Sequence, residues 1–175
     1  LSQTNMKKDY THIAPLVEEA ERAMRAAYES KGGITGLASG FTKLDDVTAG
    51  WQASDLIILA GRPAMGKTSF ALSLVKNIGI DNNEPVAFFS LEMSGKQLVN
   101  RLVSQVCEIP GHTILSGQFT KVEWERYDKR VNMILHAPIF IDDTPGLSIF
   151  ELRTKARRLV REQNVKMIMI DYLQL

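Results

Sequence analysis

The sequence predicts an α/β fold in which a mostly parallel sheet carries helices on both faces. From Trp51 onward, short apolar runs alternate with amphipathic segments of helical periodicity, the pattern of repeated strand–helix units. A glycine-rich turn motif follows the first apolar run directly and opens the first of these helices. The composition, 45% hydrophobic and 23% charged over 175 residues, is that of one globular domain and excludes a disordered or fibrous chain.

The N-terminal segment is predicted to form a separate helix over residues 15–30. Pro15 suits the first turn of a helix, where its missing N–H costs nothing. Apolar residues recur at helical spacing at Leu16, Ala20, Ala23, Met24, Ala27 and Tyr28. The glycine-rich stretch that follows, to Gly40, is predicted to be a linker. The apolar stripe must therefore pack either on its own domain or on another subunit.

Four compact apolar runs are predicted to be strands that are buried on both faces. They are residues 56–60, 86–90, 139–141 and 167–170. The helices between them are predicted over residues 67–78, 95–107, 121–135 and 149–163. Three of these helices begin with a capping box, at Ser94 and Gln97, Thr120 and Glu123, and Ser148 and Glu151.

Charge, cysteine content and hydropathy narrow the class of protein. The formal net charge is +1, which argues neither for nor against nucleic acid as a partner. A single cysteine, Cys107, excludes a disulfide framework and a multi-cysteine zinc site. No apolar stretch is long enough to span a bilayer, so we expect a cytoplasmic protein without a membrane partner. The chain begins at Leu1 and stops just after an apolar run, so we expect it to be part of a longer protein.

The strongest motif is GRPAMGKT (61–68), which matches G-x-x-x-x-G-K-[ST]. Its glycines allow a tight turn whose N–H groups converge on phosphate oxygens at a helix N-terminus. Lys67 is expected to reach the β- and γ-phosphates, and the Thr68 hydroxyl to bind Mg²⁺. A turn without a ligand would leave both residues unexplained. The predicted nucleotide-binding residues are Gly61, Arg62, Pro63, Ala64, Met65, Gly66, Lys67, Thr68 and Ser69.

Two positions compete for the carboxylate of the metal site. Asp171 follows the apolar run at 167–170, and Asp142 and Asp143 follow the run at 139–141. Ligands of open parallel sheets bind at the carboxyl ends of the strands, so both positions are plausible. Pro145 and Gly146, just after Asp142 and Asp143, are residues that favour a turn. The two aspartates are therefore expected to belong to this turn, and Asp171 is favoured as the magnesium ligand.

Glu92 comes directly after the predicted strand at 86–90. A carboxylate at this place is suited to orient a water molecule for attack on the γ-phosphate. It equally suits the start of a helix, where a negative charge interacts favourably with the helix dipole. The residues alone leave both interpretations open.

Together these motifs resemble those of the DnaB-type replicative DNA helicases. The resemblance is carried by the phosphate loop at 61–68, SLEM (90–93), MIMIDYLQL (167–175) and the lead-in GLASGFTKLDDVTAGWQASDLIILA (36–60). It implies a RecA-like P-loop NTPase fold, preceded by a separate linker helix and truncated at its C-terminus. Residues 36–175 would be the N-terminal portion of the ATPase motor domain. Residues 1–35 would hold a polar stretch, the linker helix and a glycine-rich linker.

The resemblance also implies an activity, namely ATP-dependent translocation on single-stranded DNA and duplex unwinding at the replication fork. ATP and Mg²⁺ would be the cofactors, Lys67 and Glu92 the catalytic residues, and Thr68 and Asp171 the metal ligands. The linker helix at 15–30 would dock on a neighbouring motor domain of a homo-hexamer. Primase and a helicase loader are the expected protein partners, in a cytoplasmic, nucleoid-associated setting. The arginine finger and the DNA-binding loops would lie beyond Leu175, so we expect this chain alone to be inactive.

Two other functions remain open at this stage. The chain could be a nucleotide-gated assembly module in which turnover is incidental, or a recombination ATPase similar to RadA and RecA. Stimulation of ATP hydrolysis by single-stranded DNA would distinguish a DNA motor from a nucleotide-gated assembly module. Duplex unwinding with a defined polarity separates a helicase from a recombinase.

Overall fold

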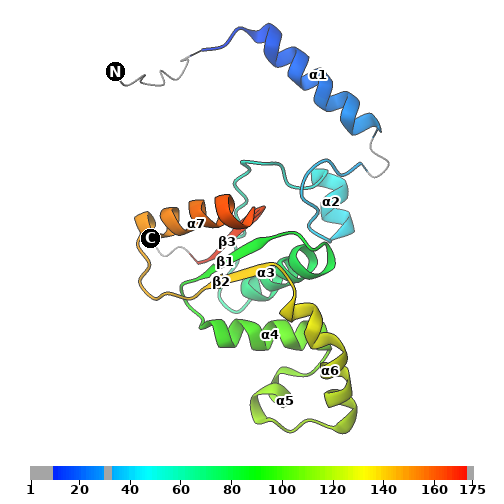
Figure 1. The fold of residues 1–175 in the computed structure, drawn as a ribbon, viewed down its shortest axis with the longest axis vertical. Helices are drawn as coiled ribbons and strands as arrows, with labels where there is room; N and C mark the ends of the chain where they lie inside the picture. The colour runs from blue at the N-terminus through cyan, green and yellow to red at the C-terminus, as the bar shows by residue number, and fades with distance from the viewer. Residues whose placement is uncertain (1–9, 30–32, 173–175) are drawn as a thin grey trace.

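A three-stranded parallel sheet forms the centre of the molecule (Figure 1). The computed structural model describes residues 10–29 and 33–172. The strands are β1 (Val86–Ser90), β2 (Ile139–Asp142) and β3 (Met167–Asp171), in the spatial order β2-β1-β3. Val86 is paired with Ile139 on one side and with Met167 on the other, so all three strands end at the same edge. This arrangement confirms the parallel sheet predicted from the sequence.

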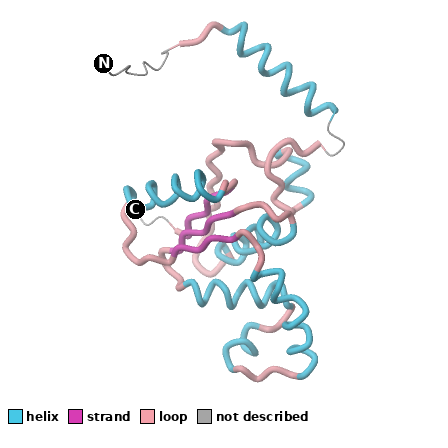
Figure 2. Tube along the Cα trace, viewed as in Figure 1, coloured by secondary structure: helices cyan, strands magenta, loops and turns pink. Residues whose placement is uncertain are grey.

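Helices cover both faces of the sheet (Figure 2). Successive side chains of β1 point to opposite faces, so β1 packs against helices on both sides. On one face, Phe88 packs with residues of α3 (Lys67–Val75) and α4 (Gly95–Cys107). A π-helical turn, η1 (Lys76–Asp81), continues α3 beyond the predicted end of that helix. On the other face, Phe89 packs with Leu152 of α7 (Ile149–Gln163). All five residues of β1 are buried, as the prediction of a strand covered on both faces requires.

A second core lies at the far end of α4, where α6 (Lys121–Leu135) packs against it (Figure 1). Cys107 is fully buried there. The short helix α5 (Gly111–Ser116) joins the two longer helices. Neither α5 nor α2 (Thr42–Thr48) is predicted by the sequence periodicity, because helices this short carry less than two full periods.

The helices that begin with capping boxes have the boundaries that the sequence predicts. At Ser94, Thr120 and Ser148, the serine or threonine oxygen accepts from the backbone N–H three residues on. The glutamine or glutamate at that position closes the box by accepting from the N-cap residue. The predicted N-terminal helix is α1 (Ile13–Glu29), which lies apart from the sheet in Figure 1. Its predicted end at residues 30–32 falls outside the described residues.

The predicted strand at residues 56–60 is wrong, because this segment is an exposed loop leading into the phosphate loop (Figure 2). Leu56 is 86% exposed and Ile58 is 79% exposed. A strand is stabilised by a hydrogen-bonded neighbour, and within residues 10–29 and 33–172 no strand pairs with this segment. Apolar composition alone therefore did not determine its structure.

Within the part of the chain that the structure describes, no helix is both long enough and apolar enough to cross a membrane.

Candidate nucleotide-binding site

Within the phosphate loop, Gly66 is the last residue before α3, which begins at Lys67. Gly66 has φ 87°, a left-handed conformation that side chains disfavour, so glycine suits the turn from the loop into the helix. No side chain caps this end of α3 in the described structure. The N–H groups of its first turn are therefore available to an anion, and the helix dipole favours one there.

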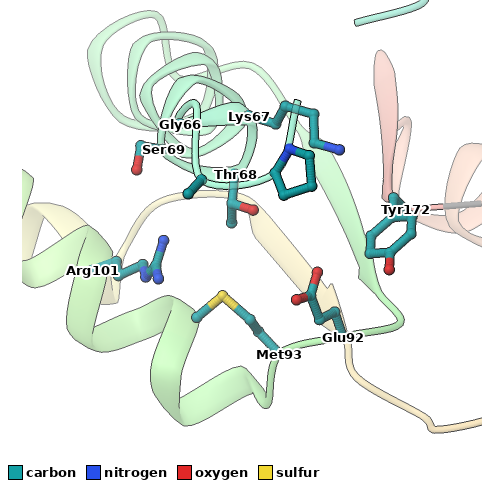
Figure 3. Close-up of a pocket in the computed structure, with 10 residues that line it drawn as sticks. Gly66, Lys67, Thr68, Ser69, Glu92, Met93, Arg101 and Tyr172 are labelled. Atoms are coloured by element: carbon teal, nitrogen blue, oxygen red, sulfur yellow. The ribbon is translucent and has the colours of Figure 1, made fainter. Parts of the chain in front are cut away.

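A pocket of about 470 Å³ opens beside the start of α3 (Figure 3). Six predicted nucleotide-binding residues line it, together with Glu92. They are Pro63, Ala64, Gly66, Lys67, Thr68 and Ser69. Gly61, Arg62 and Met65 are not part of the lining, although a Cβ on Gly61 would lie 3.4 Å from Cγ of Lys67. The structure thus brings the phosphate loop and the end of β1 to one cavity.

Thr68 and Asp171 meet at this site although they are far apart in the sequence. The Thr68 hydroxyl donates a hydrogen bond of 2.6 Å to Oδ2 of Asp171. Asp171 is buried at the carboxyl end of β3, and the parallel sheet brings that end to the phosphate loop. A hydroxyl and a carboxylate are oxygen ligands of the kind that Mg²⁺ uses together with water and substrate phosphates.

Asp142 and Asp143 are engaged elsewhere. Asp142 forms an ion pair of 2.7 Å with Lys155 and accepts hydrogen bonds from the backbone and side chain of Thr144. Burial raises the pKa of Asp142, but the hydrogen bonds from Lys155 and Thr144 outweigh burial and hold this pKa below its ordinary value. Asp143 accepts a hydrogen bond of 2.6 Å from the backbone N–H of Gly95 at the start of α4. Both carboxylates therefore stabilise turns and helix ends.

A tight turn after β1 directs Glu92 into the pocket (Figure 3). The Ser90 hydroxyl donates to the carbonyl oxygen of Met93 and accepts from its N–H, at 2.7 and 3.1 Å. The N–H of Leu91 donates to the carbonyl oxygen of Asp171, at 2.8 Å. These bonds fix Glu92 near the end of β3, on the side of the cavity opposite α3.

Three further residues line the pocket that sequence reasoning did not single out, Met93, Arg101 and Tyr172. Arg101 extends from α4 toward the start of α3 in Figure 3. The amide of Gln105, one turn further along α4, donates to the carbonyl oxygen of Ser69, which holds the two helices together. Arg101 could not be predicted, since its place depends on this packing. Tyr172 follows Asp171 directly, so its position after the strand was an available signal.

Among the described residues, no group of three or more His, Cys, Asp or Glu side chains is placed to hold a metal ion. Thr68 and Asp171 are two oxygen donors that a metal at this site could share with water and bound phosphates. That is the usual situation for Mg²⁺ in a nucleotide site.

Comparison with known families identifies the fold. Residues 36–175 match the family described as "DnaB-like helicase C terminal domain". The chain belongs to this family. The match begins at the start of the predicted lead-in and includes the phosphate loop, Glu92 and Asp171.

Individual relatives agree with this assignment to the DnaB-like family. The chain is 39% identical over its whole length to "Replicative DNA helicase DnaC" of Bacillus subtilis (strain 168), of which it spans 38%. It is 48% identical over 144 residues, or 81% of the chain, to "Replicative DNA helicase DnaB" of Nostoc sp., of which it spans 16%. The chain thus covers well under half of these relatives.

Solved structures of DnaB-like proteins share the fold. The "ATPase Domain of G40P" matches 94% of this chain with a TM-score of 0.84 and 32% identity, over 58% of its own length. A DnaB-like replicative helicase, solved in a study of its interactions with primase, matches 95% with a TM-score of 0.81 and 32% identity, over 39% of its length. The predicted RecA-like, DnaB-type α/β fold is thereby confirmed.

Proposed function

We propose that this chain forms part of the ATPase motor of a replicative DNA helicase. The observation that carries the proposal is that the phosphate loop and Glu92 line one pocket, in which Thr68 donates a hydrogen bond to Asp171. Its DnaB-like family membership and its relatives named as replicative DNA helicases support the same function. The protein would hydrolyse ATP while it translocates on single-stranded DNA, and would thereby separate the strands of the duplex at the replication fork.

In this proposal, the triphosphate binds where the N–H groups of the loop and of the first turn of α3 converge. Lys67 neutralises the β- and γ-phosphates, and Thr68 and Asp171 hold Mg²⁺. The magnesium ion, when bound, stabilises the negative charge that develops on the phosphates. Arg101 adds a second positive charge from the α4 side of the pocket.

Glu92 acts on the attacking water. A carboxylate in the pocket accepts a hydrogen bond from water and aligns its oxygen with the γ-phosphate for in-line displacement. The bond between the γ-phosphorus and the bridging oxygen breaks as the bond to the water oxygen forms. The products are ADP and inorganic phosphate, and the proton of the water passes to solvent through the carboxylate.

The proposal extends to the organisation of the whole protein. Residues 36–175 belong to the motor domain, and residues 1–35 contain the linker helix α1. Leu16, Met24 and Tyr28 of the apolar stripe on α1 are all at least half exposed, as are Ile13 and Val17 of the same helix. We infer that this apolar stripe docks on a neighbouring subunit of a homo-hexamer. A primase and a helicase loader complete the proposed partners, and the interactions with primase described for one DnaB-like replicative helicase of the same fold support the first of them.

Strand separation by the full-length protein tests this function. A forked DNA duplex with a labelled strand is incubated with ATP and Mg²⁺, and release of the strand is followed with either single-stranded tail present or removed. We expect that unwinding requires ATP, and that it is lost when one of the two single-stranded tails is removed but not when the other is. Strand exchange between homologous DNAs without unwinding would favour a recombination ATPase. Nucleotide-dependent assembly with neither reaction would favour a nucleotide-gated module.

A further inference from the structure

β2 is an outer strand of the sheet (Figure 1). One side of β2 pairs with β1, and within residues 10–29 and 33–172 no strand pairs with its other side. The free side of an edge strand presents backbone N–H and C=O groups to which another strand can bind. The outer side of β2 is therefore suited to receive an extended peptide as a further strand of the sheet.

A second pocket, of about 350 Å³, lies along β2. Its walls include every residue of β2, together with Lys155, Arg158 and Leu159 of α7. Phe140 packs with the core on the α7 face of the sheet, whereas its two neighbours in the strand pack with the core on the other face. The side chains of a strand added beside β2 would alternate in the same way, so every second one would point toward α7.

The charged groups of this pocket leave one positive charge without a partner. Lys155 and Asp142 form an ion pair of 2.7 Å. Arg158, one turn further along α7, forms no ion pair or hydrogen bond with any residue that the structure describes. Glu162 lies one turn beyond Arg158 and is paired with Arg161 instead, at 3.2 Å. The guanidinium group of Arg158 is therefore available to a ligand.

The ligand that fits these features is an acidic peptide. A guanidinium group forms charge-assisted hydrogen bonds with a carboxylate, and the backbone groups of a strand edge pair with those of another peptide. The apolar walls suit the uncharged side chains beside the acidic one. A nucleic acid would supply negative charge, but its backbone has no N–H groups to donate to β2.

We propose that the groove between β2 and α7 binds an extended acidic segment of a partner protein. The segment adds to β2 as a strand, and one of its carboxylate side chains binds Arg158. Apolar side chains two residues before and after that carboxylate lie on the same face of the added strand and contact Phe140 and Leu159. This interaction goes beyond the proposed ATPase and does not depend on it.

Selection from a random peptide library tests the proposal with the full-length protein. Displayed peptides of about eight residues, long enough to span β2, are selected on wild type and on Arg158→Glu. We expect the wild type to enrich peptides with one acidic residue between alternating apolar residues. Arg158→Glu should enrich a basic residue at the same position, because the unpaired charge of the groove changes sign. No enrichment on the wild type, or the same acidic peptides on both proteins, would overturn the proposal.

Arg157 provides a matched control, because it is also exposed on α7 and does not line the pocket. The dissociation constant of a selected acidic peptide, measured by fluorescence anisotropy, should rise at least about tenfold in Arg158→Glu and change less than about twofold in Arg157→Glu. Thermal unfolding shows whether both variants remain folded, as their exposed positions predict. Equal losses of affinity would mean that the overall charge of α7 attracts the peptide, and would contradict a specific groove.

Methylation of the peptide backbone tests strand addition itself. Two versions of the selected peptide carry N-methyl groups on alternate residues, one on the odd and one on the even positions. Since only alternate N–H groups of an added strand face β2, one version should lose at least about tenfold in affinity and the other should bind like the parent peptide. Equal affinities of the two versions would overturn strand addition. Arg158-dependent binding of a single-stranded oligonucleotide, with no peptide enriched, would assign the groove to nucleic acid instead.

Discussion

At the scale of single residues, the site depends on which aspartate lies beside the phosphate loop. The sequence offers Asp142, Asp143 and Asp171 at the ends of two strands. The strand order β2-β1-β3 and the bond from Thr68 bring Asp171 to the loop. The turn-forming residues Pro145 and Gly146 already favoured Asp171 in the sequence. In the structure, Asp142 accepts hydrogen bonds from Thr144 within that turn. The role of Asp171 as a metal ligand remains a proposal.

Asp142 gives a prediction about the pH dependence of stability. Its pKa is lowered in the folded state, so the stabilisation it provides is complete above its unfolded pKa of about 4 and is lost as the pH falls through the lower folded value. Asp142→Asn should therefore reduce the free energy of unfolding by about 1 kcal/mol at pH 7. The difference from wild type should shrink as the pH approaches 3. Urea unfolding across this range measures it, and a difference independent of pH would contradict the assigned ion pair with Lys155.

At the scale of elements, local signals account for the helices that were predicted correctly. Ser94, Thr120 and Ser148 each fix a helix start through bonds within four residues, which the sequence alone displays. The segment at 56–60 has no such local determinant, because a strand depends on neighbours that are distant in the chain. The same reason explains why Arg101 was not predicted, since its place in the pocket depends on the packing of α4 against α3.

The capping box of α7 gives a prediction at this scale. The Ser148 hydroxyl donates to Glu151 at 2.7 Å and accepts from its backbone N–H at 3.3 Å. Ser148→Ala removes both bonds and should lower the free energy of unfolding by about 1 kcal/mol. Ser148→Asn supplies another good N-cap and should recover most of this loss. Thermal or chemical unfolding of the three proteins measures the effect, and equal losses for both variants would show that the cap is not the cause.

At the scale of the whole molecule, most of the apolar stripe of α1 is exposed in the part of the chain that the structure describes. Met24 is 64% exposed, so a charge there costs little within one chain. If the stripe joins subunits of the proposed hexamer, Met24→Asp in the full-length protein should dissociate it, because assembly would bury an unpaired carboxylate. Arg22→Asp places the same side chain on the opposite face of α1 and serves as the control. Analytical ultracentrifugation distinguishes the two, and intact hexamers of Met24→Asp would show that the stripe packs elsewhere.

The central claim is that one pocket binds ATP and that Glu92 activates water for its hydrolysis. ATP turnover by the full-length protein, with and without single-stranded DNA, tests it most directly when wild type is compared with Glu92→Gln. Glutamine keeps the size of the side chain and loses the carboxylate. We predict that DNA stimulates the wild type, and that Glu92→Gln binds ATP with turnover reduced at least about a hundredfold. Equal stimulation of both proteins by DNA would contradict the role of Glu92, and a wild type unaffected by DNA would contradict the motor itself.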